Sequence, residues 1–269
     1  MSSFLDTFPI KPEPNRSPKR GETPVRAFLF DTYGTVCDFY GPLKAAFERV
    51  ALEKGVRCDA GRLAIEWRNA YARSTFLAAG FGMPFRPLKE IHRENLAALV
   101  AEHFPAPLAG DELDKLTLAW NRLDPWPDVL EGLRELRRLA IIAPLSNGNF
   151  DDMVALARHA SLPWDIILGS SVARAYKPHP DIYLKSVEAL CLAPAEVCMV
   201  AAHQVDLLYA AGHGMQTAFV IRREEFGGPI KESGSDDLSA AEVEVEGEWT
   251  YVAESFVDLA AQCRGLQEA

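Results

Sequence analysis

Long apolar runs, paired cysteines and a surplus of positive charge are all missing from this sequence of 269 residues. Without an apolar stretch of about 20 residues, no membrane-spanning helix is expected, and the N-terminus lacks the apolar core of a signal peptide. The five cysteines are scattered, with no C-x-x-C pair and no zinc-like cluster. They predict buried free thiols in a reducing cytoplasm.

The acidic balance narrows the choice of partners. Aspartate and glutamate number 38 against 28 lysines and arginines, a formal net charge of -10. This balance argues against nucleic acid and anionic membrane surfaces as partners. An anionic small-molecule substrate would have to be drawn in by a few local cations.

The chain begins with a tail and a first strand. Residues 1–23 contain four prolines and several charges, which predicts a flexible tail. Val25–Phe30 is a nearly continuous apolar run, typical of a strand buried on both faces of a parallel sheet. This strand ends at Asp31, and Gly34 then marks irregular chain.

A helical insertion follows, and then strands and helices alternate. Helices are expected at about Leu43–Lys54, Ala60–Ala79, Leu88–His103 and Asp111–Trp120. Further strands are expected at about Leu139–Leu145, Asp165–Leu168, Val197–Ala202 and Thr217–Ile221, with helices between them and a final strand and helix in Tyr251–Leu266. The acidic segment Glu232–Glu246 is expected to be a surface loop.

This order predicts an α/β fold with a doubly wound, Rossmann-like parallel sheet. Residues 24–41 and 123–269 would form the core, and residues 42–122 would form a helical cap inserted after the first strand. Ligands of such sheets bind at the carboxyl ends of the strands.

Polar residues do follow the predicted strands. They are Asp31 and Thr35 after the first strand, Ser146 and Asn147 after the second, and His203 and Asp206 after a later one, with Lys177 before a helix. Two carboxylates in one cleft repel each other, and a lysine between them lets both stay ionised. That combination suits an ionised nucleophile, Asp31, with a separate base.

Each of these residues also has a structural reading. Asp31 or Thr35 is compatible with a simple turn, and Ser146 with Asn147 is compatible with an ordinary helix N-cap. Lys177 is compatible with a solvated surface lysine, and Asp206 with a charge favoured by a helix dipole. For His203 a structural or pocket-lining role is favoured over a catalytic one.

The motifs together resemble those of the haloacid dehalogenase superfamily, and within it the type II 2-haloacid dehalogenases. The resemblance covers about Val25 to the C-terminus. It rests on Phe30-Asp31-Thr32-Tyr33-Gly34-Thr35, Ser146-Asn147-Gly148, Tyr176-Lys177-Pro178, Tyr183 and Asp206, in this order around a helical insertion.

Tyr33 decides the subdivision. Phosphatases of the superfamily carry a second aspartate two residues after the nucleophile, which protonates a basic alkoxide leaving group. A halide is a very weak base and leaves without a proton. After the later strand the segment 201–206 has only the carboxylate of Asp206, so a magnesium site looks incomplete, and no metal or cofactor is expected.

The resemblance implies a double displacement on short 2-haloalkanoic acids such as haloacetate and L-2-halopropionate. Asp31 would expel halide and form an ester, and water activated by Asp206 would hydrolyse it to the 2-hydroxy acid. Lys177 would hold both carboxylates, and Ser146 would bind the substrate carboxylate. Thr35 and Asn147 would order the site, while Tyr33, Tyr183 and His203 would line the substrate pocket.

The resemblance also assigns the halide to a cap arginine. Arg68, in Trp67-Arg68, matches the local pattern of the family, with Arg73 as the alternative and a surface arginine as the structural reading. A homodimer through the insertion is implied by the resemblance alone.

The sequence departs from the common family pattern Ser-Ser-Asn-Ala-Trp-Asp: Ala201 and Ala202 replace the serines, His203 replaces the asparagine and Val205 replaces the tryptophan, while Asp206 is kept. We expect His203 to narrow the pocket and to favour small acids. Two other functions stay open, a magnesium-dependent phosphatase of the same superfamily and a catalytically silent binding protein.

Overall fold

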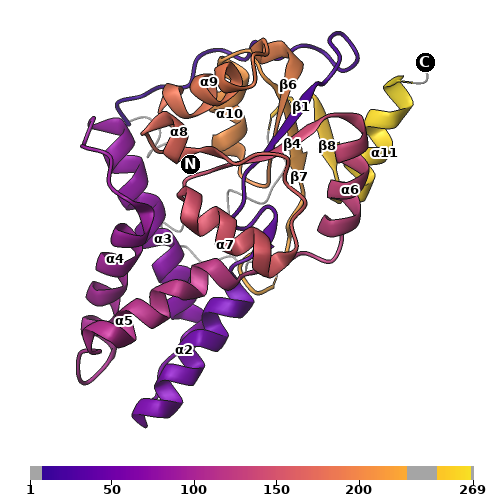
Figure 1. The fold of residues 1–269 in the computed structure, drawn as a ribbon. Coiled ribbons are helices and arrows are strands. Elements are labelled where there is room, and N and C mark those ends of the chain that lie inside the picture. The colour runs from indigo at the N-terminus through magenta and orange to yellow at the C-terminus, as the bar shows by residue number, and fades with distance from the viewer. Residues whose placement is uncertain (1–7, 229–246, 268–269) are drawn as a thin grey trace.

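The computed structural model describes residues 8–228 and 247–267. The acidic loop expected at Glu232–Glu246 lies outside these residues. Figure 1 shows a sheet flanked by helices in one part of the molecule and a group of helices extending from it.

A six-stranded sheet forms the centre of the core. Its strands run in the order β5-β4-β1-β6-β7-β8, and every neighbouring pair is parallel. The bounds are β1 Ala27–Phe30, β4 Ile141–Ser146, β5 Leu168–Gly169, β6 Val197–Ala201, β7 Gln216–Val220 and β8 Tyr251–Ala253. The expected doubly wound parallel sheet is confirmed.

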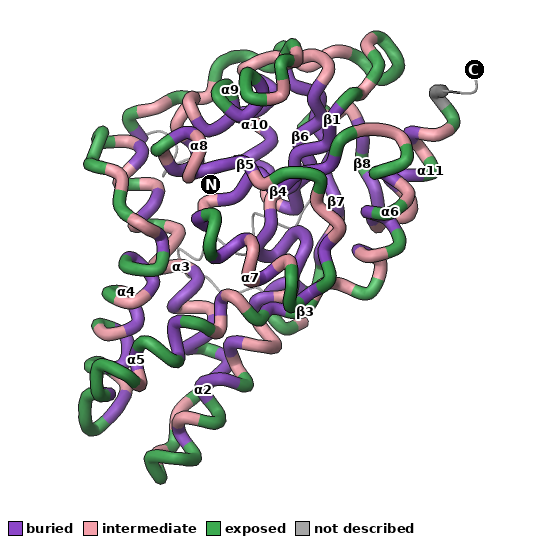
Figure 2. The backbone as a smooth tube through the Cα atoms, viewed as in Figure 1, coloured by how far each residue is buried: buried purple, intermediate pink, exposed green. Residues whose placement is uncertain are grey.

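Strand β1 is central and buried on both faces, as its apolar run predicts (Figure 2). Phe28 and Phe30 face one hydrophobic cluster, and Ala27 and Leu29 face the other. This alternation follows from the two-residue period of a strand. Because β1 lies between β4 and β6, the strand order reverses at its carboxyl end, where such sheets bind ligands.

Helices cover both faces of this sheet. The first face packs against α6 and α11, and the second against α9 and α10, with the short α8 beside α9. The bounds are α6 Val129–Leu139, α7 Phe150–Ala160, α8 Ser170–Ala173, α9 Pro180–Ala189, α10 Gln204–Gly212 and α11 Phe256–Gln267, with a 3-10 turn η2 at Pro194–Glu196. The sequence pattern did not predict α8, which is a single turn.

The insertion is helical, as expected, and extends away from the sheet in Figure 1. Its elements are α2 Tyr40–Lys54, α3 Ala60–Gly80, α4 Leu88–His103, α5 Gly110–Thr117 and the 3-10 helix η1 Leu118–Arg122. A small antiparallel pair, β2 (Cys37–Asp38) with β3 (Asp124–Pro125), joins the chain where it enters and leaves the insertion. This ribbon was not predicted, because two-residue strands leave no periodic signal.

The N-terminal segment, residues 8–23, differs from the expected flexible tail. The Phe8 ring is buried and packs on Phe76 of α3, with ring centroids 5.3 Å apart. Farther along, the Tyr209 hydroxyl of α10 donates to the Ile10 carbonyl at 2.6 Å. A buried ring and a hydrogen bond thus hold a proline-rich segment that composition alone predicts to be flexible. The segment therefore contacts both the insertion and the core.

All five cysteines are free, as expected, but only Cys37, Cys198 and Cys263 are buried; Cys58 is partly exposed and Cys191 is exposed. Within residues 8–228 and 247–267, no helix has the length and apolar character needed to cross a membrane.

Candidate active site

Asp31 lies directly after β1, at the point where the strand order reverses. Its backbone N–H still donates to the Val200 carbonyl at 2.9 Å, so strand pairing fixes the start of the loop. The chain then turns, with the N–H groups of Val36 and Cys37 both donating to the Thr32 carbonyl. This turn brings the hydroxyl of Thr35 back to donate to Asp31 Oδ2 at 2.8 Å.

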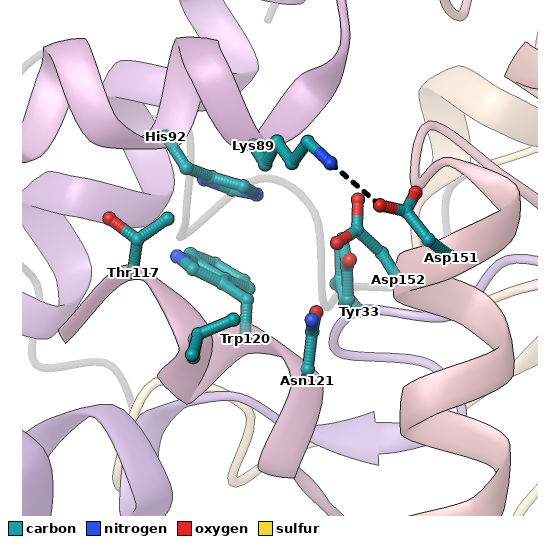
Figure 3. A pocket seen from close by; sticks show the side chains of 9 residues that line it. Tyr33, Lys89, His92, Thr117, Trp120, Asn121, Asp151 and Asp152 are labelled. Carbon is teal, nitrogen blue, oxygen red and sulfur yellow. Dashed lines mark hydrogen bonds and ion pairs between the residues drawn. The ribbon is translucent and has the colours of Figure 1, made fainter. Parts of the chain in front are cut away.

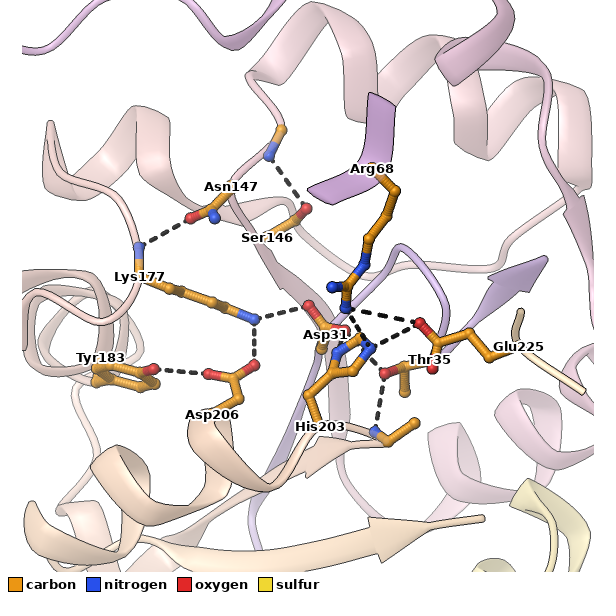
Figure 4. Close-up of polar contacts among 12 residues, drawn as sticks. Asp31, Thr35, Arg68, Ser146, Asn147, Lys177, Tyr183, His203, Asp206 and Glu225 are labelled. Atoms are coloured by element: carbon orange, nitrogen blue, oxygen red, sulfur yellow. Dashed lines mark hydrogen bonds and ion pairs between the residues drawn. The ribbon is translucent and has the colours of Figure 1, made fainter. Parts of the chain in front are cut away.

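Lys177 connects the two carboxylates, as Figure 4 shows. Its Nζ lies 2.9 Å from Asp31 Oδ1 and also donates to Asp206 Oδ2. The other Asp206 oxygen accepts from the Tyr183 hydroxyl at 2.6 Å. Asn147 accepts from the backbone N–H of Lys177 at 2.8 Å and so holds the loop that carries the lysine.

These contacts separate the pKa values of the two carboxyl groups. Burial alone would raise the pKa of Asp31, but the Lys177 ammonium and the His203 ring hold it well below its usual range. Burial raises the pKa of Asp206, and the charge of Asp31 adds to this rise while Lys177 opposes it. Burial would lower the pKa of Lys177, yet its two carboxylate partners raise it. The site therefore holds one strongly ionised carboxylate beside a more basic one, as suits a nucleophile and a base.

Ser146 and Asn147 do not cap a helix, so that structural reading is wrong. The N-cap of α7 is Asn149, whose side chain accepts from the Leu88 backbone instead. Ser146 Oγ accepts from the Gly148 N–H at 3.1 Å at the end of β4. The surface reading of Lys177 is also wrong, because this residue is 7% exposed.

Arg68 reaches the core from α3 and is 5% exposed, so its reading as a surface arginine is wrong. Its Nη2 lies 3.2 Å from His203 Nε2 and 3.8 Å from Glu225 Oε1. Arg73, the alternative, is exposed. His203 is the N-cap residue of α10 and places Nδ1 3.0 Å from Asp31 Oδ2. A contact with the carboxylate itself goes beyond the favoured pocket-lining role.

Glu225 is a site residue that the sequence reasoning missed. It lies in the turn after β7, is fully buried, and has Oε1 2.8 Å from His203 Nε2. Gly34 makes room for it, since a Cβ there would lie 2.1 Å from Glu225 Oε1 and the residue has a φ of +88°. The run Arg222-Arg223-Glu224-Glu225 has the composition of a solvated turn, although its place after a strand was a signal.

Tyr33 packs against aromatic residues of the helical insertion. It is buried, and its ring packs on those of Tyr71, His92 and Trp120. It also lines a cavity of about 120 Å³ between the insertion and α7 (Figure 3). The position two residues after Asp31 thus supplies an aromatic wall and no acid.

The part of the chain that the structure describes contains no group of three or more His, Cys, Asp or Glu side chains able to hold a metal ion. Between Asp31 and Asp206 stands the Lys177 ammonium, which is a cation of the protein itself.

The sequence matches a protein family and several of its characterised members. The model of the haloacid dehalogenase-like hydrolases matches residues 25–214. An (S)-2-haloacid dehalogenase of Xanthobacter autotrophicus is 33% identical, over 74% of this chain and 76% of the relative. A second one, from Burkholderia cepacia, is 30% identical, over 74% of this chain and 84% of the relative.

Solved structures of 2-haloacid dehalogenases have the same fold. A defluorinating L-2-haloacid dehalogenase has a TM-score of 0.82 and 39% identity, covering 93% of this chain and 98% of its own. A structure of the Xanthobacter autotrophicus L-2-haloacid dehalogenase with covalently bound chloropropionic acid has a TM-score of 0.75 and 28% identity, covering 90% of this chain and 99% of its own. The chain therefore belongs to the haloacid dehalogenase-like hydrolase family.

Proposed function

We propose that this protein hydrolyses short 2-haloalkanoic acids, such as haloacetates and L-2-halopropionate, to 2-hydroxy acids. The observation that carries the proposal is the placement of Lys177 between the ionised Asp31 and the more basic Asp206, with Tyr33 where a phosphatase needs an acid. The named activities of the 2-haloacid dehalogenase relatives support the same reaction.

In the first step an oxygen of Asp31 attacks the carbon that bears the halogen. The C–O bond forms as the carbon–halogen bond breaks, and the electron pair leaves with the halide. Arg68, at the border between cap and core, is the cation that receives this charge. In-line placement of the attacking oxygen supplies much of the acceleration.

In the second step water attacks the ester carbonyl of Asp31, and Asp206 takes the proton. The product hydroxyl oxygen therefore comes from Asp31, and the oxygen of water enters Asp31. Ser146 and nearby backbone amides bind the substrate carboxylate throughout. Because the only displacement at the halogen-bearing carbon is the attack by Asp31 in the first step, the configuration of that carbon is inverted in the product.

A single turnover in oxygen-18 water, with enzyme in excess over chloroacetate or L-2-chloropropionate, tests the reaction. We expect the label in Asp31 and unlabelled oxygen in the product. Label that appears directly in the hydroxy acid would mean that water attacks the substrate without an ester.

A magnesium-dependent phosphatase is the alternative within the family. A dehalogenase should release halide in the presence of a chelator and should release no phosphate from phosphate esters. These two measurements distinguish it from the phosphatase. A silent binding protein would show the same behaviour for wild type and Asp31→Asn in every activity screen.

The proposal also covers the domain organisation, the oligomeric state and the cellular location of the protein. Residues 42–122 act as a cap over a core of residues 24–41 and 123–269, the chain forms a dimer through this cap, and the protein works in the cytoplasm. Light scattering on a size-exclusion column tests the dimer, which a monomeric mass at all concentrations would exclude.

A further inference from the structure

The two oxygens of Asp31 have different surroundings. Among the residues that the structure describes, Oδ1 accepts one hydrogen bond, from Lys177, whereas Oδ2 faces two donors, the Thr35 hydroxyl at 2.8 Å and His203 Nδ1 at 3.0 Å. The Thr35 oxygen itself accepts from the Ala202 N–H at 2.9 Å, so its own proton is directed at Asp31. A carboxylate oxygen has about two lone pairs, which leaves Oδ1 with one free for attack and Oδ2 with none.

We propose that Thr35 and His203 form the oxyanion hole for hydrolysis of the Asp31 ester, and that the buried Glu225 is the positioning residue that keeps His203 doubly protonated. This inference rests on the proposed function and adds a residue and a role to it. Oδ1 becomes the ester oxygen, and Oδ2 becomes the carbonyl oxygen on which negative charge develops.

The electron flow follows from this assignment. Water adds to Cγ of the ester, one proton passes to Asp206, and the pair of the carbonyl double bond moves to Oδ2. On collapse this pair re-forms the double bond, the Cγ–Oδ1 bond breaks, and the departing alkoxide takes the proton from Asp206. The remaining proton of the water ionises from the regenerated Asp31. Donors already aimed at Oδ2 need no reorganisation, which is the source of oxyanion-hole catalysis.

The geometry around the His203 ring supports a double donor. Nδ1 faces Asp31 after β1, and Nε2 faces Glu225 after β7 at 2.8 Å, so each nitrogen meets a carboxylate oxygen. Arg68 on α3 is the third charged group beside the ring, and its Nη2 lies 3.2 Å from His203 Nε2. Glu225 Oε1 is nearer to that nitrogen, at 2.8 Å, and lies 3.8 Å from Arg68 Nη2, so this carboxylate oxygen faces both the ring and the guanidinium. Figure 4 shows Glu225 on the far side of the ring from Asp31.

Charge balance leads to the same protonation state. The cluster holds three carboxylates, of Asp31, Asp206 and Glu225, and the two permanent cations Lys177 and Arg68. Buried charges need partners, and a proton on His203 brings the sum to zero. Burial would lower the pKa of His203, but Glu225 and Asp31 raise it well above its usual range.

The test separates formation of the ester from its hydrolysis. Glu225→Gln keeps the shape but removes the charge, and chloroacetate is the probe. Rapid quenching followed by intact-protein mass measurement gives the amount of esterified protein. The rate of halide release gives the rate at which the ester forms. We expect ester hydrolysis to slow by about 10- to 100-fold and ester formation to change by less than about threefold, so that the ester accumulates.

Two controls sharpen the result. Glu224→Gln changes the exposed neighbouring glutamate and should leave both rates unchanged. In a His203→Asn background the donor is a neutral amide, so adding Glu225→Gln should have little further effect. Equal slowing of both steps by Glu225→Gln, or no slowing of hydrolysis, would overturn the proposal.

A measurement on the unaltered protein does not depend on folding of a variant. Nitrogen-15 NMR of labelled histidine should show His203 doubly protonated through neutral pH, and a neutral ring there would also overturn the proposal. If wild type releases no halide from any 2-haloacid, the proposed function itself fails. Normal turnover with a short-lived ester in Glu225→Gln defeats only this inference.

Discussion

At the scale of single residues, the difference in acidity between two carboxyl groups decides the order in which they are protonated. The pKa of Asp31 lies below its usual value and that of Asp206 above it. In the proposed mechanism, a fall in pH protonates Asp206 before Asp31, so that Asp206 can no longer take a proton from water while Asp31 can still attack the substrate. We therefore expect the acid limb of turnover to report on ester hydrolysis.

This order predicts that the ester accumulates in wild type under acidic conditions. Quenched reactions with chloroacetate at about pH 5 should contain more esterified protein than reactions at about pH 8, because only the second step needs ionised Asp206. Intact-protein mass measures the ester. Parallel loss of halide release and ester hydrolysis over the same pH range would contradict the assignment.

Lys177→Met tests the ion pairs of the same residues. Without the ammonium, burial and mutual repulsion raise the pKa of Asp31, so its ionised form is lost as the pH falls through a higher value than in wild type. We expect the acid limb of kcat/KM to move towards neutral pH and kcat to fall by at least about 100-fold.

The matched control is Lys185→Met, which removes a more exposed lysine paired with Asp181. It should leave the pH profile in place. An unshifted acid limb in Lys177→Met would show that the lysine does not govern ionisation of Asp31.

At the scale of elements, the N-terminal segment of residues 8–23 links the insertion to the core. Phe8 packs against Phe76 near the end of α3, and Ile10 accepts a hydrogen bond from α10. Phe8→Ala would leave a cavity at this contact. We expect the free energy of unfolding to fall by about 3 kcal/mol, measured by urea denaturation.

Leu52→Ala serves as the comparison, because Leu52 is 82% exposed on α2. Its effect should stay within about 0.5 kcal/mol. If Phe8→Ala is no more destabilising than Leu52→Ala, the segment does not contribute to stability in the way that its burial suggests.

Most elements could be predicted from the sequence, and the exceptions have physical reasons. The helix at Leu88–His103 and the strand after Val197 follow from apolar periodicity and length. The β2–β3 ribbon is held by pairing between residues 86 and 88 positions apart and carries no local pattern. The packing of Phe8 is likewise a long-range contact, which composition contradicts.

The candidate site divides in the same way. Asp31, Lys177 and Asp206 follow from strand ends and charge, and the structure brings them together. Arg68 was predicted to reach the site because of the family resemblance, since helical periodicity alone is also compatible with a surface position. Glu225 was missed because burial of a glutamate in a charged run depends on space left by a distant glycine.

At the scale of the whole molecule, the net charge of -10 opposes an anionic substrate. Raising the ionic strength from about 0.01 M to about 0.15 M shortens the Debye length from about 30 Å to about 8 Å. We expect kcat/KM for chloroacetate to rise severalfold over this range while kcat stays constant. Sodium sulfate is the suitable salt, because added chloride is itself a product. A fall in kcat/KM would mean that local cations dominate the approach of the substrate.

The close approach of Gly34 and Glu225 has an evolutionary consequence. A side chain at position 34 would displace the Glu225 carboxylate, and the φ of +88° disfavours such a side chain whatever residue stands at 225. Loss of Glu225 removes the anion beside His203 and relaxes selection for histidine there. Positions 203 and 225 are therefore expected to covary, with position 34 kept as glycine.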